Sequence, residues 1–181
     1  MLDIFATKNI YTGVTNTITR WVSPISQLFI RLLVAKVFLV SGLSKWNGLF
    51  DFDENKYDLF MYEFFCPDPV RPHALQLCDP ETLDYVDGSA MVSLIHGLAI
   101  TAGIMEVLLS SFLIIGLFSR IAALGLIGMT LFIQLAVFPT WDHWWNPAAW
   151  WFAALLCVFA TGPGKFSFDQ WLNLERTSLL K

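Results

Sequence analysis

Long, continuous apolar runs dominate the chain and fall into four segments, at about residues 24–43, 91–118, 121–138 and 147–162. A helix needs roughly 20 apolar residues to cross about 30 Å of hydrocarbon, so the second and third segments are long enough to span a bilayer. The fourth has only about 16 residues, a length that also suits a re-entrant or buried helix. Membrane β-strands are excluded because the runs lack the alternation of barrel strands. The pattern predicts an all-α integral membrane protein, a four-helix bundle formed by one domain over residues 1–181.

Composition agrees with a membrane location. Hydrophobic residues make up 56% of the chain and charged residues 14%, whereas about a quarter of the residues are charged in a typical soluble domain. Residues 1–20 are polar and mixed, without the apolar core of a cleavable secretion signal. The first apolar segment is therefore expected to serve as its own targeting element.

The distribution of Lys and Arg predicts the orientation, because short cytoplasmic loops carry an excess of these residues. Four spans put both termini on one side of the membrane. That side carries Lys8, Arg20, Arg120, Lys165, Arg176 and Lys181, whereas the opposite side carries Lys45, Lys56 and Arg71. Both termini are therefore predicted to be cytoplasmic, and the long connection at about residues 45–90 is predicted to be an exported loop.

The exported loop holds most of the 15 acidic residues of the chain. Its stretch "NKYDLFMYEFFCPDPVRP" is rich in aromatic residues, which favours an amphipathic element on the membrane surface or a cap over the bundle. Such a loop could dock an exported protein partner. A solvated acidic loop is the alternative.

Cys66 and Cys78 lie in the exported loop, where the compartment is oxidising, so a structural disulfide is the default prediction. His73 lies between them and keeps a metal site open as an alternative, because two cysteines and one histidine can bind a soft ion such as Cu(I). Their spacing fits no standard ligand motif. Cys157, in the fourth apolar segment, is expected to be a small core residue.

Charged side chains inside the spans are costly and normally face partners or a polar cavity. At 1.5 Å per residue, Lys36 and Glu106 come to similar depths of about 18 Å and 16 Å, and Gln134 to about 21 Å. We therefore expect a buried cluster of Lys36, Glu106 and Gln134, with Arg31 roughly one and a half turns below Lys36. The cluster could be an inert ion pair or a polar site for a ligand or proton, with Glu106, Lys36 and Arg31 as its reactive groups.

A second set of polar residues is predicted at the outer face. The connection "PTWDHWWNPAAWW" places His143 and Trp144 among several tryptophans. Together with His96 and Lys45, at the outer ends of their helices, His143 could line a mouth into the bundle. Cations that donate to carbonyl oxygens and a histidine that exchanges a proton would suit a quinone headgroup, with Gln134 below it. A simple interfacial belt of aromatic anchors is the alternative.

Three segments resemble the DoxX family of small four-helix bacterial membrane proteins: "RLLVAKVFLVSGLSKW", "EVLLSSFLIIGLFSRIAALGL" and "TGPGKFSFDQWL". What resembles the family pattern is an Arg early in the first helix, Gly-x-x-Lys at its end, Glu in the second helix, Gly-x-x-x-Arg after it, and a closing Gly-Pro-Gly followed by Ser-x-Asp. The resemblance covers about residues 28–172, although the exported loop with its cysteine pair is longer than in the family. It implies a protein of the bacterial cytoplasmic membrane, similar to the membrane subunits of thiosulfate:quinone oxidoreductase or to members linked with redox or metal stress.

Three functions remain open from the sequence. The leading hypothesis is a quinone-interacting membrane subunit that relays reducing equivalents between an exported partner or substrate and the quinone pool, an oxidoreductase subunit if it is an enzyme. The alternatives are a non-catalytic anchor or assembly factor, and a protein of metal handling through Cys66, His73 and Cys78. The chain contains no nucleotide-binding, haem or zinc motif, so a flavin or haem would belong to a partner. Quinone is the only cofactor expected, and no nucleic-acid partner is.

Overall fold

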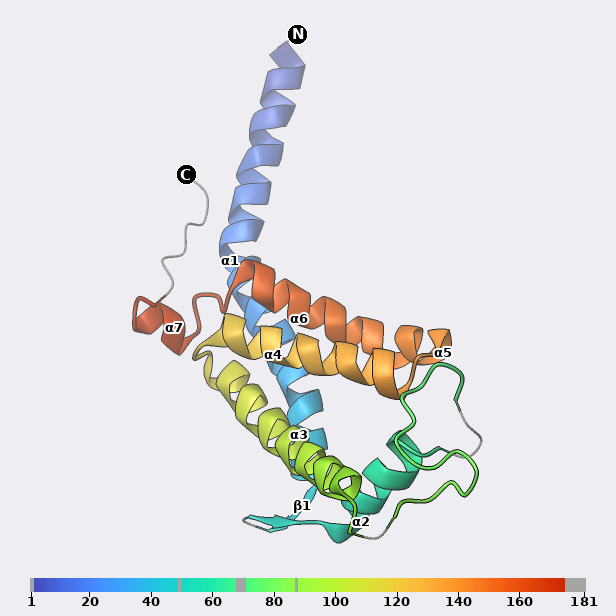
Figure 1. Ribbon diagram of the computed structural model, residues 1–181. Helices are drawn as coiled ribbons and strands as arrows, with labels where there is room; N and C mark the ends of the chain where they lie inside the picture. Colours follow the sequence, from blue (N-terminus) through green and yellow to red (C-terminus); the bar gives the residue numbers. More distant parts are fainter. Residues whose placement is uncertain (1, 49, 68–70, 87, 175–181) are drawn as a thin grey trace.

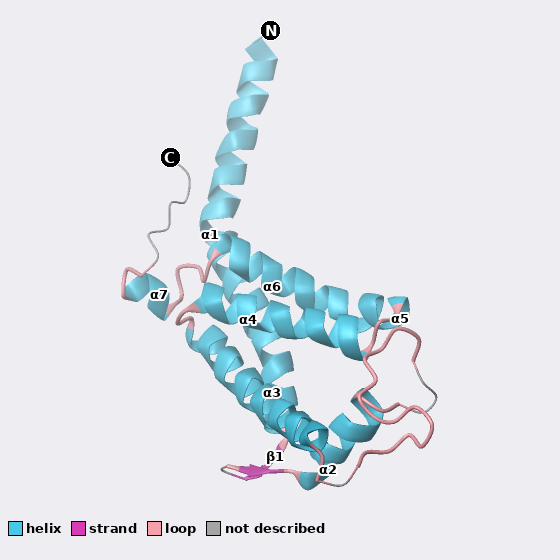
Figure 2. Ribbon diagram, viewed as in Figure 1, coloured by secondary structure: helices cyan, strands magenta, loops and turns pink. Residues whose placement is uncertain are grey.

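The computed structural model describes the backbone of residues 2–48, 50–67, 71–86 and 88–174, and side chains from residue 11 onward. Helices make up most of this part of the chain, as Figure 2 shows. In chain order the elements are α1 (Leu2–Leu43), β1 (Trp46–Gly48), β2 (Asp51–Phe52), α2 (Glu54–Asp58), the π-helical turn η1 (Leu59–Phe64), α3 (Ala90–Ile115), α4 (Ser119–Phe132), the π-helical turn η2 (Ile133–Val137), α5 (Trp141–His143), the π-helical turn η3 (Trp144–Ala148), α6 (Ala149–Thr161) and α7 (Phe168–Trp171).

Three of the described helical segments are long and apolar enough to cross a membrane: Tyr11–Leu43, Ala90–Ile115 and Ser119–Val137. They correspond to the first three predicted spans. Helix α6, in the fourth predicted segment, has 13 residues. The chain is therefore an all-α membrane protein.

Helix α1 is longer than the sequence suggests. Pro24, predicted as the start of the first helix, lies inside α1, which begins at Leu2. A proline is favoured at the first turn of a helix, but inside a helix it removes only one backbone hydrogen bond, and the helix can continue on both sides. The N-terminal part of α1 extends beyond the other helices (Figure 1).

The four longest helices pack pairwise. Helix α1 contacts α3 and α6, and α4 contacts the same two helices. One core, of residues such as Val34, Phe38, Leu126 and Leu155, lies where these helices cross. Their outer faces carry exposed apolar side chains, which suits a lipid environment.

A second core lies beneath the long connection between α1 and α3. The antiparallel β1–β2 hairpin, α2 and η1 follow the end of α1 and return over α3. Phe60 and Phe65 from this region pack with Ile95, Ala99 and Val137 from α3 and η2. The aromatic stretch predicted as a surface element or cap therefore packs against the helices with part of its side chains buried.

Candidate functional site

A buried ion pair joins the end of α1 to the middle of α3. Lys45 Nζ lies 2.6 Å from Glu106 Oε2, and the two residues are 8% and 5% exposed. The ammonium also donates to the backbone carbonyl of Ser41 at 3.2 Å and contacts its hydroxyl at 3.1 Å. Gly42 permits this approach, since a Cβ at its position would lie 2.9 Å from Glu106 Cβ. A small residue at a helix crossing thus brings Lys45 to Glu106.

The ion pair lines a cavity of about 480 Å³ between α3, α4 and η1. Its polar lining comes from Ser41, Lys45, Thr101 and Glu106. The rest is mostly apolar, with an aromatic roof formed by Phe60, Phe64 and Phe65 and with walls from α3 and α4. Ligand sites commonly have this character, an apolar pocket in which a few polar groups fix orientation.

The chemistry available in the cavity follows from the pair. An ammonium has three N–H donors, which here meet Glu106 and the two oxygens of Ser41. A carbonyl oxygen of a bound molecule can replace one of the longer Ser41 contacts while the carboxylate keeps its hydrogen bond. A carboxylate can accept a proton, and in an apolar setting the interaction between the two groups is stronger than in water. The cavity can therefore bind a polar headgroup, hydrogen-bond its oxygen and exchange a proton with it.

The predicted cluster around Lys36 is wrong. Ala35, Phe38 and Gly42 are buried, whereas Lys36 lies outside this stripe and is exposed. Gly42, six residues after Lys36 and about 9 Å farther along α1, is the position that meets Glu106, so Lys36 differs from the predicted position both in level and in the face of the helix on which it lies. Gln134, the third predicted member, bonds to His143 instead of Glu106.

Arg31 belongs to a different part of the molecule. Its guanidinium donates to the carbonyls of Pro163 and Phe166, both at 2.6 Å. Pro163 lies in the closing Gly-Pro-Gly and Phe166 two residues after it. About 18 Å of helix separates Arg31 from the end of α1 at 1.5 Å per residue. Arg31 therefore connects α1 to the chain after α6 through two hydrogen bonds, away from the Lys45–Glu106 pair.

Asp169 connects the same part of the chain to the turn between α3 and α4. Its carboxylate accepts from the backbone N–H groups of Phe118 and Ser119, at 2.7 and 2.9 Å. Gly116 ends α3 with φ of 78°, and a Cβ there would lie 2.7 Å from Arg31 Nη1. The Arg, Gly and Asp positions of the family-like pattern thus meet in one structural cluster, while Lys45 and Glu106 meet in the other.

Comparison with known families gives one match. The DoxX family model matches residues 26–139. The chain belongs to the DoxX family. The match includes every residue that lines the cavity, from Ser41 to Val137. No curated protein and no solved structure matches the chain.

In this DoxX protein, His143 and Gln134 form a cluster of their own. His143 Nδ1 lies 2.7 Å from Gln134 Oε1, and Gln134 Nε2 donates to the carbonyl of Thr140 at 3.0 Å. The imidazole stacks on Phe138, and the guanidinium of Arg71 lies 4.3 Å from the centre of the same phenyl ring. Burial, and then the positive charge of Arg71, lower the pKa of His143 below its usual value, with Asp142 opposing.

The predicted quinone-binding residues are therefore divided among several clusters. Lys45 lines the cavity, but among the described lining residues none is His96, Gln134, His143 or Trp144. His96 stacks on Tyr57 with ring centres 4.2 Å apart, and Trp144 lies against Phe152. The residues that the sequence analysis missed are those of the aromatic roof. Their signal is the run of aromatics after α2, which predicts a surface element or a cap over the bundle but does not by itself indicate a ligand site.

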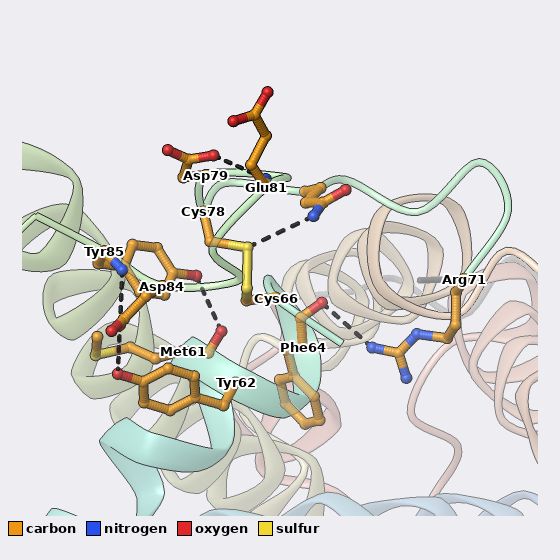
Figure 3. The surroundings of a disulfide bond; sticks show 11 residues. Met61, Tyr62, Phe64, Cys66, Arg71, Cys78, Asp79, Glu81, Asp84 and Tyr85 are labelled. Atoms are coloured by element: carbon orange, nitrogen blue, oxygen red, sulfur yellow. Dashed lines mark hydrogen bonds between the residues drawn. A yellow bond between two sulfur atoms is a disulfide. The ribbon is translucent and has the colours of Figure 1, made fainter. Parts of the chain in front are cut away.

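The structure contains the predicted disulfide between Cys66 and Cys78, with Cα atoms 5.5 Å apart (Figure 3). Both sulfurs are bonded to each other, so neither is a thiolate available to a metal, and His73 is exposed. Within the described residues, no group of three or more His, Cys, Asp or Glu side chains could hold a metal ion. The alternative of a Cys66, His73 and Cys78 metal site has no support in this structure.

The disulfide-closed segment holds the aromatic roof in place. Leu77 N donates to the carbonyl of Phe65 at 2.9 Å, and Arg71 donates to the carbonyl of Phe64 at 3.3 Å. Leu75 N donates to the carbonyl of Ala136 at 2.7 Å, which connects the segment to η2. Because η1 and η2 both contribute to the cavity lining, this segment fixes two of its walls relative to each other.

Proposed function

We propose that this DoxX protein is a quinone-interacting membrane subunit of a redox system. It relays reducing equivalents between an exported partner or substrate and the quinone pool. The observation that carries the proposal is the apolar cavity of about 480 Å³ lined by the buried Lys45–Glu106 pair. A quinone has the same division, with polar carbonyl oxygens on a ring and an apolar tail.

Each member of the pair has a distinct part in this proposal. Lys45 donates a hydrogen bond from Nζ to a carbonyl oxygen of the quinone, and Glu106 holds Lys45 in position. A quinone takes up two electrons and two protons when it is reduced to the quinol. Both protons come from water, and Glu106 is the group beside the headgroup that can take them up and pass them on one at a time. The electrons come from the exported partner, because the chain has no flavin- or haem-binding motif of its own.

The quinone proposal is tested by isolating the protein in discs cut directly from its native membrane. Extraction and mass spectrometry should recover quinone at about one per chain from wild type and clearly less from Lys45→Met, because the donor to the headgroup is lost. Lys36→Met is the matched control, since it removes an exposed lysine from α1, the helix that leads into Lys45. Wild-type discs with no more quinone than the surrounding lipid would refute the proposal.

The membrane arrangement is part of the same proposal. Helix α6, with η3 before it, is taken as a fourth span of a four-helix bundle, and both termini then lie in the bacterial cytoplasm with residues 45–90 exported. Lys8→Cys, Arg176→Cys and Lys56→Cys, each combined with Cys157→Ser, can be treated in spheroplasts with a membrane-impermeant thiol reagent. Labelling is expected at position 56 only. Labelling at position 8 or 176 would overturn the orientation.

A second candidate function is docking of an exported protein, with the redox chemistry in that partner alone. It is favoured by the exposed carboxylates on the loop: Asp51, Glu54, Asp58, Glu63, Asp79, Glu81 and Asp84. Like charges on one surface attract a basic partner and make its association sensitive to salt. Neutralising Asp79, Glu81 and Asp84 should then abolish co-purification of a partner while leaving bound quinone unchanged.

A further inference from the structure

Helices α3 and α4 diverge from the tight turn that joins them (Figure 1). Each contributes a stripe at the same helical spacing to the cavity lining. The stripe of α3 is Leu98, Thr101, Ala102 and Met105, and that of α4 is Gly125, Gly128, Met129 and Phe132. Both follow the i, i+3, i+4, i+7 pattern of one helix face. The cavity therefore lies in the groove between two diverging helices.

The groove opens toward the membrane. Leu98, Met105 and Phe132 line the cavity and are nevertheless 38%, 40% and 47% exposed. Leu98 and Met105 lie within the span Ala90–Ile115 and Phe132 within the span Ser119–Val137, each at least five residues from the end of its span. A side chain that is both in the cavity wall and exposed at that depth lies at an opening toward lipid.

Gly128 lies at this opening and keeps it wide. It lines the cavity, it is exposed, and a Cβ built at its position would meet no heavy atom within 4 Å. Gly125, one turn away, is different because a Cβ there would lie 2.8 Å from Leu109 Cδ1. A larger side chain at 128 would therefore occupy the opening without displacing a neighbour from its packed position.

We infer that the α3–α4 groove is a lateral portal, through which the isoprenoid tail of a quinone leaves the cavity for the bilayer while its headgroup contacts Lys45 and Glu106. The inference rests on the proposed function and names how the ligand enters and which part of it the groove binds. Two observations select this occupant. The groove is continuous with a polar pair that suits a carbonyl headgroup, and its opening lies at the depth of the lipid tails.

Gly128→Leu tests the portal in nanodiscs of defined lipid. Binding of ubiquinone with one isoprene unit and of ubiquinone with eight units is measured by quenching of tryptophan fluorescence. The variant should weaken binding of the long-tailed quinone at least about tenfold, which corresponds to about 1.4 kcal/mol. Binding of the short-tailed quinone should change less than about twofold, well under that energy. Gly97→Leu is the matched control because Gly97 is also exposed on α3 with no heavy atom within 4 Å, yet it does not line the cavity.

The possible outcomes separate the two proposals. Equal weakening of both quinones, or no change in either, would overturn the portal and leave the headgroup site standing. If wild type binds neither quinone, the proposed function fails and the portal with it. A ubiquinone that carries a photoreactive group in its second isoprene unit gives an independent measurement on wild type. The label should attach to peptides containing residues 98–105 or 125–132, and attachment only to α1 or α6 would overturn the portal.

Discussion

Replacing Glu106 by glutamine removes the negative charge from the ion pair while keeping the shape of the side chain. Lys45 then remains as a cation that is 8% exposed, with only the Ser41 oxygens and a neutral amide as acceptors. Removing one member of a buried ion pair typically costs about 3–5 kcal/mol, because it leaves an uncompensated buried charge. The contacts with Ser41 remain, so we expect a loss of about 3 kcal/mol in the free energy of unfolding, the lower end of that range.

The loss can be measured by equilibrium unfolding in mixed micelles, followed by far-UV circular dichroism as the fraction of denaturing detergent rises. The double variant Lys45→Met with Glu106→Gln removes the orphan charge and should recover most of the lost stability. Lys36→Met serves as the control. It removes an exposed lysine from a span without breaking an ion pair to any described residue, so it should not destabilise the protein.

Quinone binding separates a structural pair from a functional one. A double variant that regains stability but no longer binds short-tailed quinone would show that the pair serves the ligand. If the free energy of unfolding of Glu106→Gln lies within about 0.5 kcal/mol of wild type, the range of a neutral surface change, the pair does not stabilise the fold. The pairing of Lys45 with Glu106 is refuted equally if Lys36→Met is as damaging as Glu106→Gln, since the exposed lysine would then be the partner that matters.

Three further predictions concern the other clusters, and the stability change in each is measured by the same unfolding experiment. Arg31→Met should lower the free energy of unfolding by about 3 kcal/mol or more, since hydrogen bonds to charged groups are worth about 1.5–3 kcal/mol each and the carbonyls of Pro163 and Phe166 lose their donor. An unchanged free energy of unfolding would contradict a stabilising role for Arg31. Cys66→Ser combined with Cys78→Ser should lower the free energy of unfolding by about 3 kcal/mol. It should also weaken binding of the short-tailed quinone, because the disulfide no longer holds the aromatic roof in place. Unchanged binding would show that the roof keeps its position without the disulfide. The lowered pKa of His143 means that the unfolded chain takes up the proton first as pH falls through about 6.5, so folding stability drops in acid until the folded pKa is passed. His143→Gln should reduce that drop, and an identical pH dependence in both proteins would refute the assignment.

Much of the fold could be predicted from the sequence because the bilayer imposes a length and a composition on each span. The boundaries predicted for the second and third helices agree with α3 and with α4 plus η2 to within a few residues. The extent of α1 before Pro24 could not be predicted in this way, since residues 2–23 carry no long apolar run. A short separation between two cysteines, in a loop predicted to face an oxidising compartment, is enough to predict the disulfide that the structure contains.

The site was predicted less well, for a reason that membrane helices share. In a soluble helix the polar face identifies the side turned away from the core. In a span the lipid-facing side is also apolar, so the pattern shows that a residue lies in the span but not which side of the helix carries it. Counting residues puts Lys36 and Glu106 at similar depths, whereas Gly42, six residues and about 9 Å of helix beyond Lys36, is the position that meets Glu106. Nothing in the apolar run shows this offset or the face on which Lys36 lies. The decisive signal was Gly42, three residues before Lys45. A glycine near the end of a span indicates where another helix can approach closely, and the cation that follows it is then the one placed to meet the carboxylate of α3.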